Sequence, residues 1–385
     1  TLDQNPYLLP FRNGCFDFSV RIFRDLTPED RCSNHVEYNY SPDPNPEIED
    51  KLITVIKQIF PVEELFDYMM SFLGSCLVGI KREDRLFHIG YGVGANGKTI
   101  IQKLMSYVLG PYAGTVTSSL FTTKSTNPDA PTPGLVSMIG KRFIYMSETE
   151  NGTQFNESLV KLLIGGDDIA VRAIYKESTT LKPQFKILMV ANDLPKFRGE
   201  EYSMQRRLAV IPFLSQFVDH INPNQEGYFF QKNSQLDEWI KKIEVVQAFS
   251  RLLIYQCLLY LESETTIVPN IIQQHTFNYI NENNDIESFF NNCFEVTTDN
   301  TNEQWKKEFT FSQILAHYKL YLASNGKPIP NGLSHKKYPP ELINKFVNIG
   351  FIRRHGQTRK ILVGFTCTCD HNYEGKSSNL DPFFT

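Results

Sequence analysis

A glycine-rich segment near residue 90 constrains this chain more than any other part of its sequence. The run RLFHIGYGVGANGKT, residues 85–99, opens with apolar residues typical of a buried strand and leads into a helical pattern. Between the two, Gly92, Gly97, Lys98 and Thr99 form the spacing G-x-x-x-x-G-K-T. Glycines let successive backbone N–H groups turn inward, so that an anion can bind at the start of a helix. The segment therefore predicts a phosphate-binding loop.

The chemistry expected of this loop is the binding of nucleotide phosphates and magnesium. Lys98 is expected to reach the β- and γ-phosphates, and the Thr99 hydroxyl to hold Mg²⁺. The loop also reads G-x-G-x-x-G, but a dinucleotide site needs an acidic residue about twenty positions later. No Asp or Glu lies between Asp84 and Asp129, so a nucleoside triphosphate is favoured. The expected nucleotide-binding residues are Gly92, Val93, Gly94, Ala95, Asn96, Gly97, Lys98 and Thr99.

Composition is that of an ordinary soluble globular protein with two or three domains. The chain has 385 residues, 41% of them hydrophobic and 21% charged, and a net charge of −4. Such a charge gives no general attraction to nucleic acid, so contacts with DNA must come from a local basic surface. The most apolar window, residues 65–80, is too short to span a membrane. Because the chain begins at Thr1, we expect a fragment or a processed polypeptide.

Cysteine usage favours an intracellular, reducing compartment. The chain has 7 cysteines without a repeated spacing. Cys367 and Cys369 lie close to His371, a grouping compatible with zinc, but a second ligand pair at the usual spacing is missing. A solvated tail is therefore favoured there.

Residues 1–81 are expected to form a mostly helical lead-in domain. An Asn13-Gly14 turn predicts a β-hairpin between residues 8–12 and 15–18. A proline-rich acidic stretch, residues 41–50, is expected to be a linker. The apolar patterns that follow predict helices at 51–59 and 62–79.

Residues 82–218 are expected to form an α/β core. Short runs rich in branched and aromatic residues predict buried parallel strands, and longer patterns between them predict helices. The strands are expected at 86–90, 142–147, 185–191 and 207–212, and the helices at 98–109 and 157–164.

The rest of the chain is expected to form a helical connector, residues 219–284, and a winged-helix-like domain, residues 285–385. The connector should hold helices at 236–261 and 271–280. The winged helix is predicted from helices followed by a hairpin, with strands at 351–354 and 360–365.

Polar residues that follow the core strands are candidates for catalysis. Glu148 and Glu150 follow the strand at 142–147, where a carboxylate can hold the magnesium shell and act as a base on water. Asn192 ends the next strand and is a candidate to orient that water and sense the γ-phosphate. The alternative is that these polar residues simply lie in solvent-exposed turns at the strand ends.

Two groups of cations complete the candidate site. Arg206 and Arg207 could neutralise transition-state charge from a neighbouring subunit, or simply anchor a strand at the surface. Farther upstream, cations alternate with an aromatic residue, which suits single-stranded nucleic acid, although a solvated basic loop is the alternative. The expected DNA-binding residues are Arg172, Tyr175, Lys176 and Lys182.

The order of these motifs resembles the superfamily 3 helicases, and most closely the primase-helicases of poxviruses and other nucleocytoplasmic large DNA viruses. The motifs that carry the resemblance are GxGANGKT, SETE, GGDDIAVRAIYKE, the strand ending in Asn192, and QRRLAVIPF. A looser likeness extends to FRNGCFDF and to the C-terminal SQILAHYKLYLASNG. The resemblance implies an AAA+-like P-loop core that hydrolyses ATP with Mg²⁺. It also implies a hexameric ring that translocates on single-stranded DNA, typically 3′ to 5′.

The resemblance also implies a role for each matched residue. Lys98 and Thr99 match the first nucleotide motif, Glu148 the second, Asn192 the sensor, and Arg206 or Arg207 the arginine finger. The second motif, S-E-T-E, lacks an acidic pair, which leaves the division between Glu148 and Glu150 open. Residues 172–182 match the DNA-binding hairpin.

The expected setting is DNA replication by a virus in the host cytoplasm. Expected partners are single-stranded and forked DNA, further copies of the chain, and replication proteins such as a polymerase or a processivity factor. Primer synthesis is not expected from these residues. The alternative function is an initiator or scaffold that binds DNA and uses ATP only to control assembly. A packaging motor or a small-molecule phosphotransferase is less favoured.

Overall fold

A computed structural model describes residues 2–80, 82, 86–122, 132–147, 156–192, 194, 206–222, 224–283, 285–296, 309–325, 361–362 and 365–367. Contacts divide the chain into two compact units, Thr1–Ile280 and Asn281–Thr385. The expected four-part division stays a prediction. No helix in the described ranges is long and apolar enough to cross a membrane.

A five-stranded parallel sheet lies at the centre of the first unit. Its strand order is β10-β4-β9-β6-β5, so β9 lies between β4 and β6 although it follows β6 in the chain. The strands are β4 (Phe87–Tyr91), β5 (Ala113–Thr117), β6 (Phe143–Ser147), β9 (Lys186–Ala191) and β10 (Leu208–Pro212). The four expected strands are confirmed. The apolar pattern does not predict β5, because its residues AGTVT include only one large apolar side chain.

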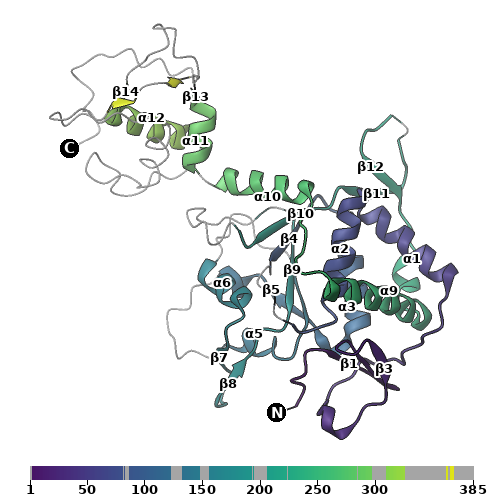
Figure 1. Cartoon of the computed structure of the whole chain (residues 1–385). Helices are drawn as coiled ribbons and strands as arrows, with labels where there is room; N and C mark the ends of the chain where they lie inside the picture. Colours follow the sequence, from purple (N-terminus) through teal and green to yellow (C-terminus); the bar gives the residue numbers. More distant parts are fainter. Residues whose placement is uncertain are drawn as a thin grey trace. The chain divides into compact units, whose positions relative to one another are not determined.

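Each face of this sheet is covered by helices, because successive side chains of a strand point to opposite faces. Tyr145 and Leu188 pack into one core, whereas Ile144 and Met189 pack into the other. The first face carries α2 (Glu63–Ser75), α3 (Lys98–Leu109) and α9 (Ile243–Glu262), and the second carries α5 (Pro133–Val136) and α6 (Glu157–Gly165). Figure 1 shows the sheet between these two groups. The predicted core is therefore a mixed α/β domain.

Helix boundaries differ from the expected ones at three points. The helix expected at 62–79 is α2, which ends at Ser75. The first helix, α1 (Pro46–Ile59), begins inside the expected linker, because Asn45 caps it by accepting from Ile48 N at 3.3 Å and proline is tolerated at the first helical position. The single helix expected at 236–261 is in fact two, α8 (Leu236–Trp239) and α9. The helix expected at 271–280 is α10 (Asn270–Asn283).

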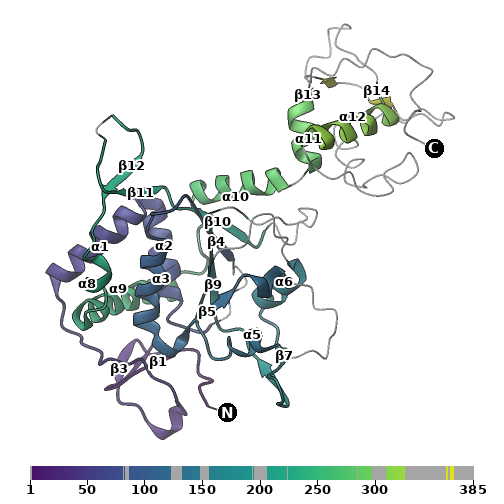
Figure 2. The same ribbon diagram turned by 180° about the vertical axis from the view of Figure 1, so that it is seen from behind.

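A small antiparallel sheet precedes these helices. It consists of β1 (Leu8–Phe11), β2 (Gly14–Asp17) and β3 (Ile22–Arg24), in that order. Phe11 pairs with Gly14, which confirms the predicted hairpin but makes Arg12 and Asn13 its turn, one residue earlier than expected. Figure 2 shows this sheet beside the helices of the first face.

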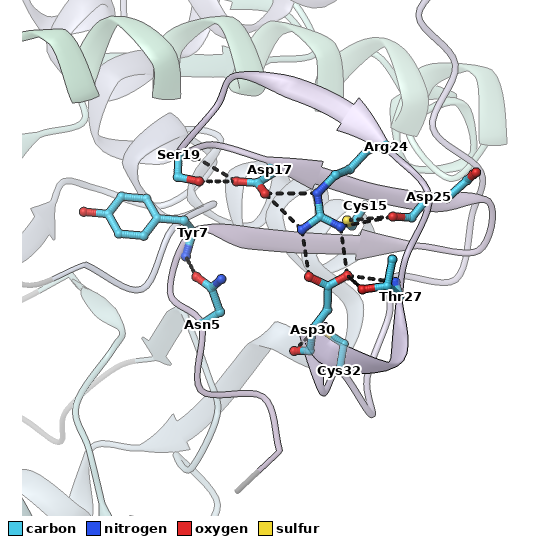
Figure 3. Close-up of polar contacts among 10 residues, drawn as sticks. All are labelled: Asn5, Tyr7, Cys15, Asp17, Ser19, Arg24, Asp25, Thr27, Asp30 and Cys32. Carbon is cyan, nitrogen blue, oxygen red and sulfur yellow. Dashed lines mark hydrogen bonds and ion pairs between the residues drawn. The ribbon is translucent and has the colours of Figure 1, made fainter.

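An ion-pair cluster holds the edge of the small sheet to the loop that follows it (Figure 3). The Arg24 guanidinium donates to both carboxylate oxygens of Asp30, at 2.7 and 2.8 Å, and to Oδ2 of Asp17 at 3.0 and 3.1 Å. Asp30 also accepts from the backbone and the hydroxyl of Thr27. Hydrogen bonds from Arg24 hold the pKa of Asp30 well below its ordinary value.

Two buried cations join residues 1–80 to the central sheet. Arg142, just before β6, donates to the carbonyls of Leu8 and Leu77, each at 2.5 Å. Lys186, the first residue of β9, donates to the Ser75 carbonyl at 2.7 Å. Carbonyls at the end of a helix carry partial negative charge, so cations placed there stabilise the junction. The lead-in residues are thus packed against the core within one unit.

The second unit contains two helices and two short strand pairs among its described residues. Helix α11 (Asp285–Cys293) packs on α12 (Phe311–Ser324) through Phe289, whose ring centre lies 5.1 Å from that of Tyr318. The pairs are β13 (Phe294–Val296) with β16 (Phe365–Cys367), and β14 (Phe309–Thr310) with β15 (Ile361–Leu362). The strand expected at 351–354 lies outside the described residues, so the winged helix stays a prediction.

Candidate functional site

The predicted phosphate loop lies at the carboxyl end of β4 and leads into α3. Two of its glycines cannot carry a side chain. A Cβ on Gly92 would lie 2.6 Å from the Phe213 carbonyl oxygen, and one on Gly97 would lie 2.6 Å from Cγ1 of Ile59. Gly97 also has φ +89°, which favours glycine. By contrast, a Cβ on Gly94 would meet nothing within 4 Å of it. The loop is therefore tightly packed at both ends and open in the middle.

Lys98 joins this loop to the end of the neighbouring strand. Its Nζ donates to the carbonyl of Gly92 at 2.6 Å and to Oδ1 of Asn192 at 2.8 Å. A longer contact, 3.4 Å, reaches the Ala191 carbonyl. Asn192 is brought here by topology, because β9 pairs with β4 in a register that sets Ala191 beside Tyr91. The structure thus brings two of the predicted catalytic residues together.

The start of α3 has the features of an anion site. No side chain among the described residues caps its first turn, which also contains no acid. Asn96 is buried, and its Nδ2 has no hydrogen-bond partner among the described residues. Thr99 is exposed beside Lys98. Uncapped N–H groups, a buried amide donor and a lysine make a set of donors that fits phosphate.

A pocket of about 550 Å³ opens over the loop. One wall comes from the loop, Gly94 to Ile100, and from Asn192. A second wall comes from Phe217 of β11 (Ser215–Val218) and from residues that follow β12 (Tyr228–Gln231), namely Lys232, Asn233, Ser234, Leu236 and Asp237. Such a volume is within the roughly 300–1,000 Å³ typical of small-molecule sites. The sequence missed this second wall, whose residues match no motif.

Arg206 and Arg207 lie at the amino ends of the parallel strands, whereas the loop follows the carboxyl end of β4. They directly precede β10, which runs parallel to β4 with Leu208 beside Phe87. The Arg207 carbonyl accepts from the N–H of Phe87 at 2.7 Å, at the amino end of β4. The loop follows the carboxyl end, five residues and about 16 Å farther along the strand. These arginines are not brought to the phosphate loop of their own chain.

The predicted DNA-binding segment forms an antiparallel hairpin. Its strands are β7 (Ile169–Arg172) and β8 (Ser178–Leu181), and their buried residues pack into the core that covers the second face of the sheet. Tyr175, in the turn, is fully exposed and has φ +59°, an uncommon conformation for a tyrosine. Arg172, Lys176 and Lys182 are also exposed. The hairpin thus presents an aromatic ring and three cations to solvent.

The expected acidic residues cannot be placed. β6 ends at Ser147, at the same carboxyl edge as the loop, but Glu148 and Glu150 lie outside the described residues. Within the described ranges, no group of three or more His, Cys, Asp or Glu side chains is placed to hold a metal ion. The magnesium site expected at Thr99 and Glu148 therefore stays a prediction, and Cys369 of the C-terminal cysteine pair also lies outside the described residues.

Comparison with known proteins gives the chain relatives in large DNA viruses. A family model described as "D5 N terminal like" matches residues 1–60, and one for a family of unknown function, DUF5906, matches residues 90–207. The chain is 32% identical over 347 residues to "Putative helicase L207/L206" of Acanthamoeba polyphaga mimivirus, covering 88% of this chain and 35% of the relative. It is 28% identical over 321 residues to "Putative helicase 184R" of Invertebrate iridescent virus 6, covering 77% of this chain and 33% of the relative.

More distant relatives include a protein named as a primase. "Putative primase C962R" of African swine fever virus is 23% identical over 260 residues, covering 66% of this chain and 27% of the relative. Among solved structures, the apo C-terminal region of NrS-1 matches with a TM-score of 0.48 and 12% identity, covering 85% of this chain and 79% of that one.

These relatives have much longer chains. This chain spans about a third of the length of the first two curated relatives that it matches. The match to the mimivirus relative extends over 88% of this chain, and the N-terminal 60 residues of this chain match the D5-type family model. The chain belongs to the D5-type primase-helicase family.

Proposed function

We propose that this chain is the helicase part of a viral-type replication protein and that it hydrolyses ATP to translocate on single-stranded DNA. The observation that carries the proposal is the contact of Lys98 with both Gly92 and Asn192, over a pocket large enough for a nucleotide. Phosphate-binding donors, a strand-end amide and a lysine converge there from β4, α3 and β9. The names of the relatives, helicases and a primase, support the same function.

The residues of the loop fit a triphosphate and its metal ion. Lys98 would neutralise the β- and γ-phosphates, the N–H groups at the start of α3 would bind them, and the Thr99 hydroxyl would be a metal ligand. Bound Mg²⁺ would supply charge that stabilises the departing phosphate. Asn192 would hold a water molecule in line with the γ-phosphate, and Glu148 or Glu150 would accept its proton.

The position of Arg206 and Arg207 supports a shared site between copies of the chain. They lie about 16 Å along the strand from their own loop, farther than an arginine side chain reaches. If either arginine stabilises the transition state, it must therefore act at the loop of a neighbouring copy. A closed ring of copies, hexameric in our proposal, would give every phosphate loop such a neighbour.

The hairpin of β7 and β8 is proposed to contact the DNA strand. Exposed cations attract the phosphates, and an exposed ring such as that of Tyr175 offers a face for base stacking. We place the protein in a viral replication site in the host cytoplasm, together with a polymerase or a processivity factor.

A mixing experiment tests the proposal. Lys98→Ala, Arg206→Ala and Arg207→Ala are each assayed for ATP hydrolysis and fork unwinding, alone and in mixtures. Lys98→Ala should abolish hydrolysis, as should whichever arginine acts. A mixture of the two inactive variants should regain hydrolysis, because some interfaces then pair an intact lysine with an intact arginine.

Two outcomes would contradict the proposal. Normal hydrolysis by Lys98→Ala would exclude this loop as the ATPase site. Wild-type protein that binds DNA in an ATP-dependent manner, yet neither unwinds a fork nor turns over ATP, would favour an initiator or scaffold.

A further inference from the structure

The second wall of the pocket over the phosphate loop has no assigned role. The pocket of about 550 Å³ is far larger than a phosphate group needs. For scale, one water molecule occupies about 30 Å³ in the liquid. The space beyond the loop is bounded by Phe217, in the ribbon formed by β11 and β12, and by the turn that follows this ribbon. Both Figure 1 and Figure 2 show this ribbon next to the end of α1.

This wall is fixed to the loop by several contacts. The N–H of Phe217 donates to the carbonyl of Ala95, within the loop, at 2.8 Å. The Ser215 hydroxyl donates to the carbonyl of Ile59 at 3.3 Å, and Ile59 packs directly under Gly97. Asp237 pairs with Lys103 of α3 at 2.9 Å. The wall and the phosphate loop are therefore held at a defined separation.

The chemistry of the wall suits a flat heterocycle with a sugar. Phe217 and Leu236 supply apolar surface, whereas Lys232, Asn233, Ser234 and Asp237 supply charged or polar groups. Phe217 is half-buried and packs on Phe230, with ring centres 5.8 Å apart, so its ring is held in place. Asn233 uses Oδ1 to accept from the N–H of Gln235 at 3.0 Å, an arrangement that keeps its amide in the turn. An apolar face beside a few polar groups is the usual composition of a ligand site.

We propose that Phe217 and the pocket-lining residues of the turn at 232–237 form the nucleoside half of the site. Phe217 would lie against the base, and Asn233 and Ser234 would meet the polar edge of the base or the ribose. This inference rests on the proposed function, because it takes the loop to bind the phosphates of the same molecule. On this proposal, the β11–β12 ribbon and its turn distinguish a nucleotide from a simple polyphosphate. Both follow residues 90–207, which match the DUF5906 family model.

The test compares the affinities of ADP and of pyrophosphate, measured by calorimetry with Mg²⁺. Wild-type protein should bind ADP more tightly than pyrophosphate. Phe217→Leu, which keeps an apolar side chain without a ring, should lose at least about fivefold in ADP affinity, the lower end of base–aromatic stacking, and Asn233→Ala should also weaken ADP. Pyrophosphate affinity should stay unchanged in both variants.

Matched controls separate this inference from instability and from failure of the proposed function. Tyr228→Leu removes an exposed ring from the same ribbon, and Gln235→Ala alters the same turn. Neither residue lines the pocket, so neither variant should change ADP affinity. Equal ratios of ADP to pyrophosphate affinity in wild type, Phe217→Leu and Asn233→Ala would overturn the inference, as would equal binding of the two ligands by wild type. Unchanged binding of both ligands by Lys98→Ala would instead overturn the proposed phosphate site.

Discussion

The Lys98 ammonium donates to Oδ1 of Asn192 at 2.8 Å, although the two residues lie 94 positions apart. The contact exists because β9 is placed beside β4, so that the end of one strand meets the loop after the other. It couples the residue expected to bind the γ-phosphate with the residue expected to orient the attacking water. A ligand that draws Lys98 toward phosphate must therefore change the environment of Asn192.

Substitution of Asn192 should separate nucleotide binding from hydrolysis. Asn192→Ala removes an acceptor from Lys98 but no phosphate ligand, so ATP should bind within a few-fold of wild type, whereas hydrolysis should fall about a hundredfold, as for the loss of other polar groups that act in a transition state. Asn192→Asp gives Lys98 an anionic partner that competes with phosphate, so ATP binding itself should weaken. Binding constants and single-turnover rates would distinguish the two variants. Equal effects of both on binding would show that the contact has no part in phosphate recognition.

The glycines of the loop should differ in their tolerance of a methyl group. Gly97→Ala places a Cβ 2.6 Å from Ile59 at a φ of +89°, so it should lower the free energy of unfolding by about 1–2 kcal/mol from the backbone conformation alone, with the overlap in addition. Gly94→Ala meets nothing within 4 Å and should leave stability within about 0.5 kcal/mol. Urea unfolding of both variants measures the difference. Similar midpoints for the two would contradict the described packing of the loop.

The loop and its strand and helix could be predicted from sequence because they are encoded locally. Gly97, Lys98 and the apolar run before them specify a strand, a turn and a helix within fifteen residues. The contact of Lys98 with Asn192 is of another kind, since it depends on strand order, which periodicity does not reveal. Asn192 itself is nevertheless a candidate from sequence, because it follows an apolar run and matches the sensor position in the family resemblance.

The second wall of the pocket could not be predicted for a similar reason. Phe217 and the turn at 232–237 reach the loop only because the chain returns after β10 and forms a ribbon against it. The break before α9 was also missed, because residues 236–261 keep a helical apolar pattern through it. Arg206 and Arg207 were recognised by residue type, but only the parallel pairing of β10 with β4 reveals how far they lie from their own loop.

The cluster around Arg24 should make the lead-in residues sensitive to acid. Both carboxylates have pKa values below their ordinary ones in the folded state. Hydrogen bonds from Arg24 lower the pKa of Asp30. Burial alone would raise the pKa of Asp17, but hydrogen bonds from Ser19 and Arg24 outweigh burial and lower it. A lowered pKa stabilises the folded state fully above the unfolded value of about 3.9, and this stabilisation is lost as the pH falls through the folded-state values. Stability should therefore decline below about pH 4.

The test of this cluster is Arg24→Gln, which leaves two largely buried carboxylates without their cation. We expect a loss of about 2–3 kcal/mol at neutral pH, less than for a fully buried pair because the Arg24 side chain is 29% exposed. Arg12→Gln, which breaks an exposed pair with Glu37, should leave the free energy of unfolding nearly unchanged. Below pH 4 the difference in free energy of unfolding between Arg24→Gln and wild type should become smaller. A constant difference between pH 7 and pH 3 would show that the carboxylates are not coupled to Arg24.

The tip of the β7–β8 hairpin should contribute to DNA binding without contributing to stability. Tyr175 is fully exposed at φ +59°, so Tyr175→Gly relieves backbone strain and removes the ring. The midpoint of thermal unfolding of Tyr175→Gly should be equal to or above that of wild type. Its affinity for single-stranded DNA should fall at least about fivefold, because a base loses its stacking partner. Lys176→Ala should weaken binding and reduce the dependence of affinity on salt, since one phosphate contact fewer releases fewer counterions. Glu177→Gln removes an acid from the same turn and should not weaken binding. If Tyr175→Gly and Lys176→Ala bound DNA as wild type does, the hairpin would be an exposed basic turn with no role in DNA recognition.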